Sequence, residues 1–425
     1  MDRPGLLETR SDDMADQKAE CKKRFDRVMD AVHLKETDRV PIIPVTQYYP
    51  YLYGGGTISK CMYDWEYAGA CMDKYYEDFK PDLGWDPVHM YPGQYLEACG
   101  LKWFRWPGGA LEGNAPYQYI EGDYMLEDEY KEAARDMTKF MMNKWIPRCF
   151  EHLGGFKKLG FRNSMWFSHM GTLAAFGDPE VEKSLMAAIK AGKILRDWYA
   201  YLAEYGQKME NVFGVPVAYA AWAFAPYDMI ADTLRGTLGM CYDIIERKEE
   251  ILELIDAITD FAIEDTISGA KAAGRPWVWF WLHRGTDEFM SEKTYGELYW
   301  PSLRKYIIAL VDAGLVPMVY VEGAYNNRLQ FLADVPKGKV VYSFEKIDME
   351  KAKKVLGGTA CIAGNLPNAM LAYGSKEEVV NYCKWLIDTC APGGGYMFDT
   401  GALIDEAKQE NMEAMFDTVQ TYGKR

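Results

Sequence analysis

Three residues with complementary chemistry follow one apolar run of the sequence. His283, Arg284 and Asp287 come directly after residues 277–282. An imidazole can move a proton, a guanidinium can hold an anionic or oxygen-bearing substrate, and a carboxylate can orient either group. We therefore assign catalytic roles to His283 and Asp287 and a substrate-binding role to Arg284. The structural alternative is a loop salt bridge between Arg284 and Asp287 that His283 solvates.

A single carboxylate follows a second apolar run. Glu322 comes after residues 318–321, and Gly323 leaves room beside it. Because a buried glutamate needs a partner, His283, Arg284 or a metal ion could each serve. We expect Glu322 to be catalytic. The alternative is a supporting carboxylate that fixes the loop 325–328.

Further candidates for substrate binding lie at the ends of other apolar runs. Trp222 is the aromatic residue best placed to stack on a planar substrate, and Asn365 follows the run 360–364. His169 follows the run 163–168. A lone histidine on an apolar run is more often a satisfied core residue than a ligand, and this alternative stays open for His169.

The sequence contains no complete metal-binding motif. Paired CxxC, HExxH and His-x-Cys motifs are all absent, and the chain has five histidines. A zinc site with three protein ligands would have to assemble from separated residues, and the candidates are His283, Glu322 and His169. The presence of a metal ion is therefore left open.

These candidates act together only if distant apolar runs end at one place in the fold. Short runs that are apolar on both faces alternate with helical segments, which indicates a mostly parallel sheet. The runs span residues 40–45, 163–168, 215–222, 277–282, 316–321, 340–344, 360–364 and 395–398. The first run is not followed by a glycine-rich phosphate-binding motif, so an open nucleotide-binding sheet loses its main support. We therefore expect an α/β fold of the (β/α)8 TIM barrel type, in which the residues after the strands face one mouth.

The domain organisation follows from the distribution of these patterns. Residues 1–23 are polar and are expected to form a flexible leader, and residues 24–425 are expected to form a single barrel domain. Within it, residues 48–158 are rich in Gly, Pro, Tyr and Trp and predict an excursion over the barrel mouth. Two helix starts are well marked: Asp178 precedes Pro179, and Ser375 begins a capping box.

Composition excludes several classes of protein. Apolar residues make up 49% of the chain, but no run approaches the roughly 18 residues that a membrane span requires. The N-terminus lacks the apolar core of a secretory signal, so we expect a cytoplasmic protein. A formal charge of −15 without clusters of Lys and Arg argues against a nucleic-acid partner.

Several short motifs together resemble the uroporphyrinogen decarboxylase superfamily, from Arg24 to Gly423. The motifs are RFDRVM at 24–29 with DRVP at 38–41, LRGTLGM at 234–240, SEKTY at 291–295, GNLP at 364–367, the capping box at Ser375, GGY at 394–396, TG at 400–401 and ENM at 410–412. Each motif is short, but their order and spacing match the family. The resemblance implies a barrel of the uroporphyrinogen decarboxylase type.

Departures from the family narrow the expected activity. True uroporphyrinogen decarboxylases carry an arginine-rich loop after the first strand, whereas residues 46–51 here read TQYYPY, so porphyrinogen decarboxylation is not expected. The methyltransferases that serve coenzyme M hold zinc through a His-x-Cys pair and a distant cysteine. The matching positions here are Tyr320, Glu322 and Ala402, so the usual zinc ligands are missing.

The sequence is instead similar to the branch that demethylates small substrates, often aromatic methyl ethers. This resemblance implies a corrinoid-dependent methyltransferase that passes a methyl group to Co(I) of a separate corrinoid-binding protein. Glu322 and His283 would handle the proton or a metal ion, Arg284 would hold an anionic group, and Tyr48 and Trp222 would frame a ring. His169, Tyr320 and Asn365 complete the expected substrate-binding residues.

Two other functions remain as alternatives. The first is a decarboxylase or carbon–carbon lyase that acts on a small non-porphyrin carboxylic acid held by Arg284. The second is a non-catalytic ligand-binding barrel. The expected partners are a small methyl donor and a corrinoid-binding protein, without nucleic acid or membrane, and the sequence leaves a homodimer open.

Overall fold

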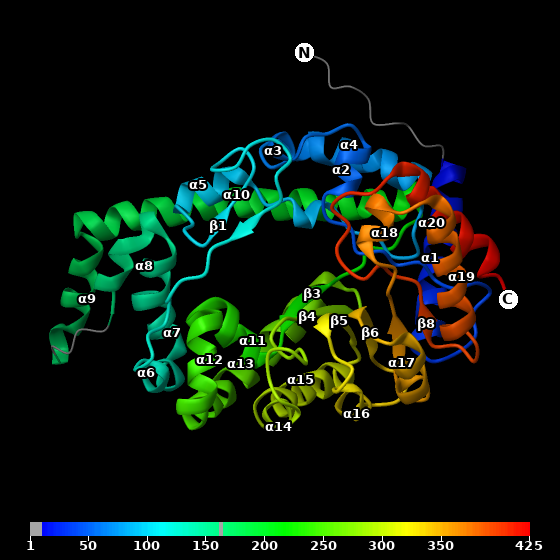
Figure 1. The fold of residues 1–425 in the computed structure, drawn as a ribbon. Helices are drawn as coiled ribbons and strands as arrows, with labels where there is room; N and C mark the ends of the chain where they lie inside the picture. The colour runs from blue at the N-terminus through cyan, green and yellow to red at the C-terminus, as the bar shows by residue number, and fades with distance from the viewer. Residues whose placement is uncertain (1–10, 161–164) are drawn as a thin grey trace, which may run out of the picture.

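The computed structural model describes residues 11–160 and 165–425 of the chain. Its centre is a six-stranded parallel sheet whose strand order follows the chain, with helices on the outside (Figure 1). The strands are β3 (Ala221–Phe224), β4 (Trp277–Leu282), β5 (Val316–Ala324), β6 (Val341–Lys346), β7 (Cys361–Ala363) and β8 (Tyr396–Met397). All six overlap or adjoin apolar runs that were predicted to be strands, which confirms this part of the prediction.

Two short extended segments close the sheet into a barrel. Segments 41–45 and 82–85 fill the gap between β8 and β3, and backbone hydrogen bonds join each segment to its neighbours. The N–H of Ile43 donates to the carbonyl oxygen of Phe398, and the N–H of Phe398 donates to that of Pro41, which joins segment 41–45 to the end of β8. The N–H of Asp82 donates to the carbonyl oxygen of Ile42, which joins the two segments. The N–H of Gly84 donates to the carbonyl oxygen of Pro216, and the N–H of Ala218 donates to that of Gly84, which joins segment 82–85 to the residues that lead into β3. Eight extended segments thus complete a ring, and the expected (β/α)8 TIM barrel is confirmed.

The strand sequences explain the packing on both sides of the barrel wall. Successive side chains of a strand point to opposite faces, and every residue of β4 is buried. Trp279 and Trp281 belong to the inner cluster, whereas Phe280 and Leu282 belong to the outer cluster under the helices. Tyr320 pairs in register with Trp281, so both lie at one level inside the barrel.

The helices that follow the strands cover the outside of the barrel. They include α11 (Pro226–Ile230), α12 (Gly236–Glu246), α13 (Lys248–Ala273), α14 (Glu292–Thr294), α15 (Trp300–Asp312), α16 (Leu329–Leu332), α17 (Met349–Leu356), α18 (Asn368–Tyr373), α19 (Lys376–Cys390) and α20 (Gln409–Tyr422). Ser375 and Glu378 form the predicted capping box of α19. Among the described residues, no helix combines the length and apolarity needed to cross a membrane.

The N-terminal part of the chain packs on the barrel as helices and one short hairpin. Its α-helices and strands are α1 (Ser11–Val32), α2 (Tyr49–Tyr53), α3 (Ile58–Cys61), α4 (Trp65–Asp78), α5 (Gly93–Cys99), β1 (Phe104–Arg105), β2 (Gln118–Tyr119), α6 (Tyr130–Arg135), α7 (Met137–Phe140) and α8 (Ile146–Cys149). The first helix begins at Ser11, so residues 11–23 of the expected leader are helical. The region 48–158 is also more regular than expected, because it contains helices and the barrel segment 82–85.

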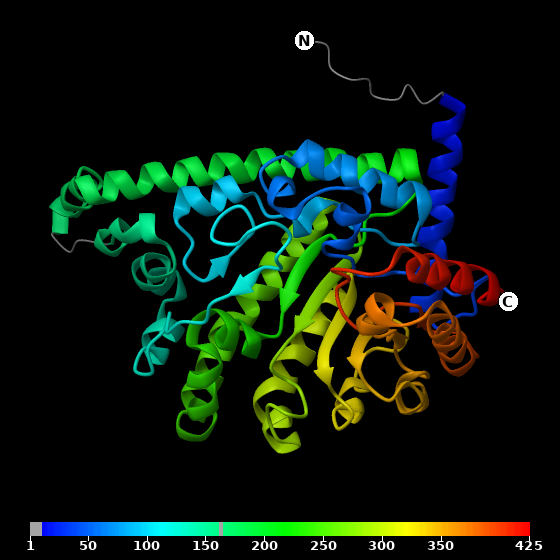
Figure 2. The same cartoon turned by 45° about the horizontal axis from the view of Figure 1, so that its top comes forward.

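A long helix leads out of this region. Asp178 accepts hydrogen bonds from the first turn of α10 (Pro179–Lys208), as its sequence predicted. Figure 2 shows α10 as a rod along one side of the barrel that extends beyond it. The protruding end of α10 carries α9 (Ser168–Phe176).

Candidate active site

The predicted imidazole and carboxylate meet at the ends of neighbouring strands. His283 follows β4, and Glu322 lies near the end of β5, whose Val321 pairs in register with Leu282. His283 Nε2 and Glu322 Oε2 are 3.8 Å apart. The convergence that the sequence predicted for these two residues is therefore present in the fold.

A second carboxylate holds the imidazole from its other side. Asp232 Oδ2 lies 2.6 Å from His283 Nδ1, and Asp232 Oδ1 accepts a 2.8 Å bond from Arg284 Nε. Burial alone would lower the pKa of His283, but the bond to Asp232 and the charge of Glu322 outweigh it and raise this pKa to about 9. The imidazole is therefore protonated at neutral pH and can donate a proton.

Asp228 fixes the backbone at His283 and Arg284. Its fully buried carboxylate accepts bonds from the N–H groups of His283 and Arg284, at 2.9 and 3.1 Å, and from the hydroxyl of Tyr299 at 2.6 Å. Burial, and then the charge of Asp232, raises the pKa of Asp228. The sequence reasoning missed both aspartates, although their spacing of four residues places them on one face of a helical turn.

The end of β5 is fixed by a neighbouring carboxylate. Glu345 Oε2 accepts a 2.6 Å bond from the N–H of Gly323. Gly323 has a φ of +76°, and a Cβ there would lie 2.6 Å from the Thr286 side chain, so the turn after Glu322 requires glycine. Burial raises the pKa of Glu322, the positive His283 opposes this shift, and the charge of Glu345 adds to it.

Arg284 and Asp287 have partners other than each other. Arg284 Nη2 donates a 3.0 Å bond to Glu121, which lies beyond β2 in the excursion and so ties it to the barrel mouth. Asp287 accepts a 3.2 Å bond from the N–H of Asn327 and lies 3.6 Å from Arg328. The structural alternative of a loop bridge between Arg284 and Asp287 is therefore wrong, and the predicted role of Asp287 stays a prediction.

Aromatic side chains continue from this charged site into the barrel. Trp222 stacks on Trp281 and on Trp85, with ring centroids 5.8 and 5.7 Å apart. Tyr320 lies 4.9 Å from Trp281, and its buried hydroxyl has no hydrogen-bond partner among the described residues. Tyr48 is buried, and its hydroxyl accepts a 3.0 Å bond from the N–H of Tyr117. Three of the predicted binding residues are thus held in aromatic contacts at or near the mouth.

Asn365 has a bonding role that the sequence does not reveal. Its amide nitrogen donates bonds of 3.2 Å to the carbonyl oxygens of Glu345 and Ile347. Its amide oxygen accepts a 3.3 Å bond from the hydroxyl of Tyr382. In the structure Asn365 therefore joins the ends of β6 and β7, and its predicted contact with substrate stays a prediction.

His169 lies apart from the other predicted residues. Part of the run 163–168 lies outside the described residues, and Ser168 begins helix α9, in which His169 is exposed. Figure 1 shows α9 at the far end of α10 from the sheet. The prediction that His169 follows a barrel strand is wrong, because a short apolar run does not distinguish a strand from a helix.

The metal set proposed from the sequence is not assembled. His169 is remote from His283 and Glu322, so these three residues do not share a site. Within residues 11–160 and 165–425, no group of three or more His, Cys, Asp or Glu side chains is placed to hold a metal ion. The prediction of a site built from these three ligands is therefore wrong.

One more histidine at the mouth was missed by the sequence reasoning. His89 follows segment 82–85, and its Nδ1 lies 2.9 Å from the carbonyl oxygen of Thr46. Burial lowers the pKa of His89 to about 4. The sequence did not predict a strand before His89, because DLGWDP at 82–87 contains two aspartates, a glycine and a proline, which are uncommon in strands.

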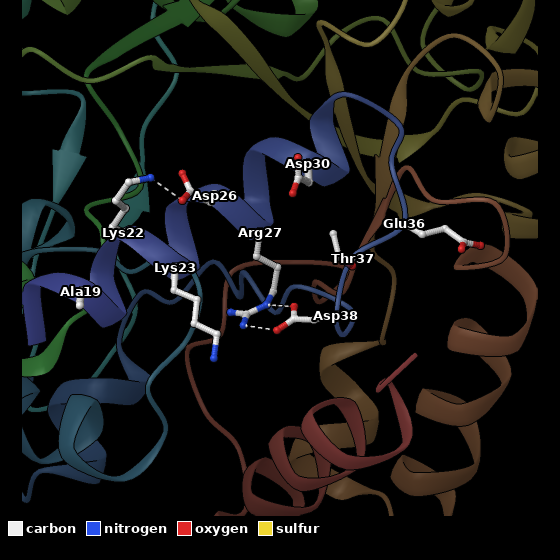
Figure 3. A pocket seen from close by; sticks show the side chains of 9 residues that line it. All are labelled: Ala19, Lys22, Lys23, Asp26, Arg27, Asp30, Glu36, Thr37 and Asp38. Carbon is white, nitrogen blue, oxygen red and sulfur yellow. Dashed lines mark hydrogen bonds and ion pairs between the residues drawn. The ribbon is translucent and has the colours of Figure 1, made fainter. Parts of the chain in front are cut away.

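A hollow of about 360 Å³ lies elsewhere on the molecule, against α1 (Figure 3). Arg27 in this hollow donates bonds of 2.6 and 2.8 Å to Asp38. The loop that contains Asp38 leads into the start of segment 41–45, so the hollow lies at the N-terminal ends of the strands. In TIM barrels the N-terminal end of the strands contributes to stability, and the active site lies at the opposite end.

Comparisons with known proteins agree with this fold. The family model "Uroporphyrinogen decarboxylase (URO-D)" matches residues 173–422. A solved methyltransferase from Methanosarcina mazei is similar, with a TM-score of 0.59 and 16% identity over 93% of this chain and 98% of that chain. A B12-independent methionine synthase from Shewanella sp. W3-18-1, solved in complex with selenomethionine, has a TM-score of 0.30 and 13% identity over 47% of this chain and 59% of that chain.

No curated protein matches the sequence. The family model nevertheless spans more than half of the chain and includes all six strands of the central sheet. The protein therefore belongs to the uroporphyrinogen decarboxylase family.

Proposed function

We propose that the protein is a methyltransferase that moves a methyl group from a small methylated substrate to Co(I) of a separate corrinoid protein. The observation that carries this proposal is the pairing of His283 with Asp232 and Glu322 at the barrel mouth. A methyl ether leaves as an alkoxide or phenoxide, and such a leaving group needs a proton. The protonated His283 is a suitable donor.

The chemistry divides between the two proteins. The corrinoid supplies the nucleophile, whose electron pair forms the new bond to the methyl carbon, while the electrons of the broken carbon–oxygen bond stay on oxygen. His283 gives that oxygen a proton, and Asp232 holds the imidazole in place and favours its charged form. This chain therefore contributes positioning and activation of the leaving group.

The aromatic surroundings support a planar substrate. Trp222, Trp281 and Tyr320 form a continuous set of ring contacts, in which Trp281 and Tyr320 lie two residues before His283 and Glu322 along β4 and β5. Aromatic rings stack favourably on other rings. A methoxyaromatic methyl donor is accordingly the substrate class that we propose.

The decarboxylase alternative receives less support. It requires Arg284 to bind a substrate carboxylate, but Arg284 Nε and Nη2 already bond Asp232 and Glu121. The guanidinium is therefore neutralised by two carboxylates of the protein itself. Mass spectrometry of reactions with small carboxylic acids would reveal a decarboxylated product if this alternative holds.

The direct test is a methyl transfer assay. The protein is incubated with a reduced corrinoid protein and a panel of methyl ethers and methylamines, and methylcobalamin is followed by its absorbance. We expect the spectrum of methylcobalamin with an aromatic methyl ether, a strong loss in His283→Gln, and no loss in His33→Gln, an exposed histidine at the other end of the barrel. Absence of methylcobalamin with every substrate would contradict the proposal, and a non-catalytic barrel would bind ligands without any turnover.

A further inference from the structure

The protruding end of α10 and the helix α9 that it carries have an exposed apolar surface, and we call residues 166–196 the arm. None of the side chains of α9 is buried by the described residues. The exposed large apolar side chains of the arm include Trp166, Met170, Leu173, Met186 and Ile189. A helix of nine residues is too short to be stable in water without tertiary packing, and monomeric proteins rarely expose apolar side chains in such a group. The arm therefore needs a surface that covers it.

Helix α12 carries a second exposed apolar surface of the same kind. Leu238, Tyr242 and Ile245 are all exposed, and their spacing of four and three residues places them on one face of the helix. Phe261 is exposed on α13, which packs against α12. Figure 1 shows α9 and α12 at the same end of the molecule, separated by α6 and α7. One chain thus has two apolar surfaces at one end that do not cover each other.

The charges beside these two surfaces have opposite signs. Residues 183–196 of the arm contain three lysines and one arginine without Asp or Glu, and none of the three lysines has an ion pair within the described residues. Residues 249–265 of α13 contain seven Asp and Glu without Lys or Arg. The whole chain has a formal charge of −15, so most surfaces of two copies repel each other. The basic arm is an exception, and the acidic α13 of another copy is a complementary surface for it.

We propose that two copies of this chain form a two-fold dimer by exchanging arms, so that the arm of each copy lies on α12 and α13 of the other. A two-fold axis repeats every contact, because the residues that one copy offers are offered in return by its partner. One arrangement therefore covers both apolar surfaces and pairs both sets of charges in each copy. This inference does not depend on the proposed function.

Charge reversal on each surface tests the arm exchange. Sedimentation equilibrium of the full chain should show a dimer for the wild type. An arm variant with Lys190→Glu and Lys193→Glu, and an α13 variant with Glu253→Lys and Glu264→Lys, each place like charges opposite one another in their own dimers. We expect the dissociation constant of each variant to rise at least about tenfold. A control with Lys354→Glu and Lys376→Glu makes the same change of charge on the exposed surfaces of α17 and α19 and should dimerise like the wild type.

An equal mixture of the two variants gives the sharpest result. The acidic arm of one variant meets the basic α13 of the other, and the second contact of this mixed pair keeps its wild-type charges. We therefore expect the mixture to form a dimer at concentrations at which each variant alone is monomeric. Recovery of the dimer in the mixture would also show that both variants are folded.

Several outcomes would overturn the proposal. A wild type that stays monomeric at every concentration would exclude the dimer, and this measurement requires no variant. Wild-type dimerisation of either variant would place the contact between copies on another surface. A mixture that stays monomeric would show that the arm does not lie on α13. A monomeric wild type that binds a corrinoid protein, with loss of this binding in the arm variant, would assign the arm to that partner instead of a second copy.

Discussion

At the scale of single residues, the ion pair between His283 and Asp232 predicts a dependence of stability on pH. The pKa of His283 is raised from 6.5 to about 9 in the folded protein. The folded state therefore binds an extra proton between these values, and the contribution to stability is full below 6.5 and is lost as pH rises through about 9. We expect the urea midpoint of unfolding to fall over this range.

Asp232→Asn should flatten this dependence, because it removes the carboxylate that holds the proton on His283. Asp256→Asn, on the exposed face of α13, is a matched control that should keep the wild-type slope. An unchanged slope in Asp232→Asn would show that this ion pair does not govern the titration of His283.

Glu322→Gln tests whether Glu322 takes part in catalysis. The substitution keeps the size of the side chain but removes the charge that helps to hold the proton on His283. We expect kcat of methyl transfer to fall by about a hundredfold or more, which is typical for loss of general acid–base catalysis, with a small change in KM. A variant that changed KM alone would make Glu322 a binding residue.

The sequence predicted part of this site, and the missing part has a physical reason. His283 and Glu322 were found because each directly follows an apolar strand, and strand ends of a barrel converge. Asp228 and Asp232 lie on the turns after a different strand, so their contact with His283 exists only in the tertiary structure. His169 was misplaced because its apolar neighbours belong to helix α9, where several of them are exposed, and a short apolar run does not distinguish such a helix from a buried strand.

At the scale of elements, strands were predictable where composition and burial agree. Residues 277–282 are apolar on both faces and form β4 over the predicted range. Segment 82–85 escaped prediction, because its strand is only a few residues long and is flanked by Pro81 and Pro87. Its role in closing the barrel depends on backbone bonds to distant segments, which side-chain patterns do not encode.

The capping box of α19 gives a prediction about one helix. Ser375 accepts a bond from the N–H of Glu378, and Glu378 accepts one from the N–H of Ser375. Ser375→Ala should lower the free energy of unfolding by about 1 kcal/mol, since the first turn loses its cap. Ser375→Thr keeps a capping hydroxyl and should cost much less. Chemical denaturation measures both, and a loss of methyl transfer in Ser375→Ala at temperatures where it is folded would contradict a purely structural role.

At the scale of the whole molecule, the two ends of the barrel have different roles. The C-terminal ends of the strands hold His283 and Glu322, while the N-terminal ends hold a buried cluster around Asp82. Asp82 accepts bonds of 2.7 Å from Arg27 and of 2.6 and 2.8 Å from Arg39. It also accepts a 2.8 Å bond from the N–H of Ile42. One carboxylate thus joins α1 to both segments that close the barrel.

Asp82→Asn should therefore destabilise the closure of the barrel without altering its chemistry. The side chain of Asp82 is 0% exposed, and its loss of charge leaves Arg27 and Arg39 without their buried partner. Breaking a buried pair in this way costs about 3–5 kcal/mol, whereas Asp38→Asn should cost far less, because that side chain is 57% exposed and its ion pair with Arg27 is screened by water. Denaturant unfolding measures the difference, and ligand binding at the mouth should stay at the wild-type level in both variants while they remain folded. Equal costs for the two substitutions would mean that Asp82 does not hold the barrel closed, and the fold would then depend on its apolar clusters alone.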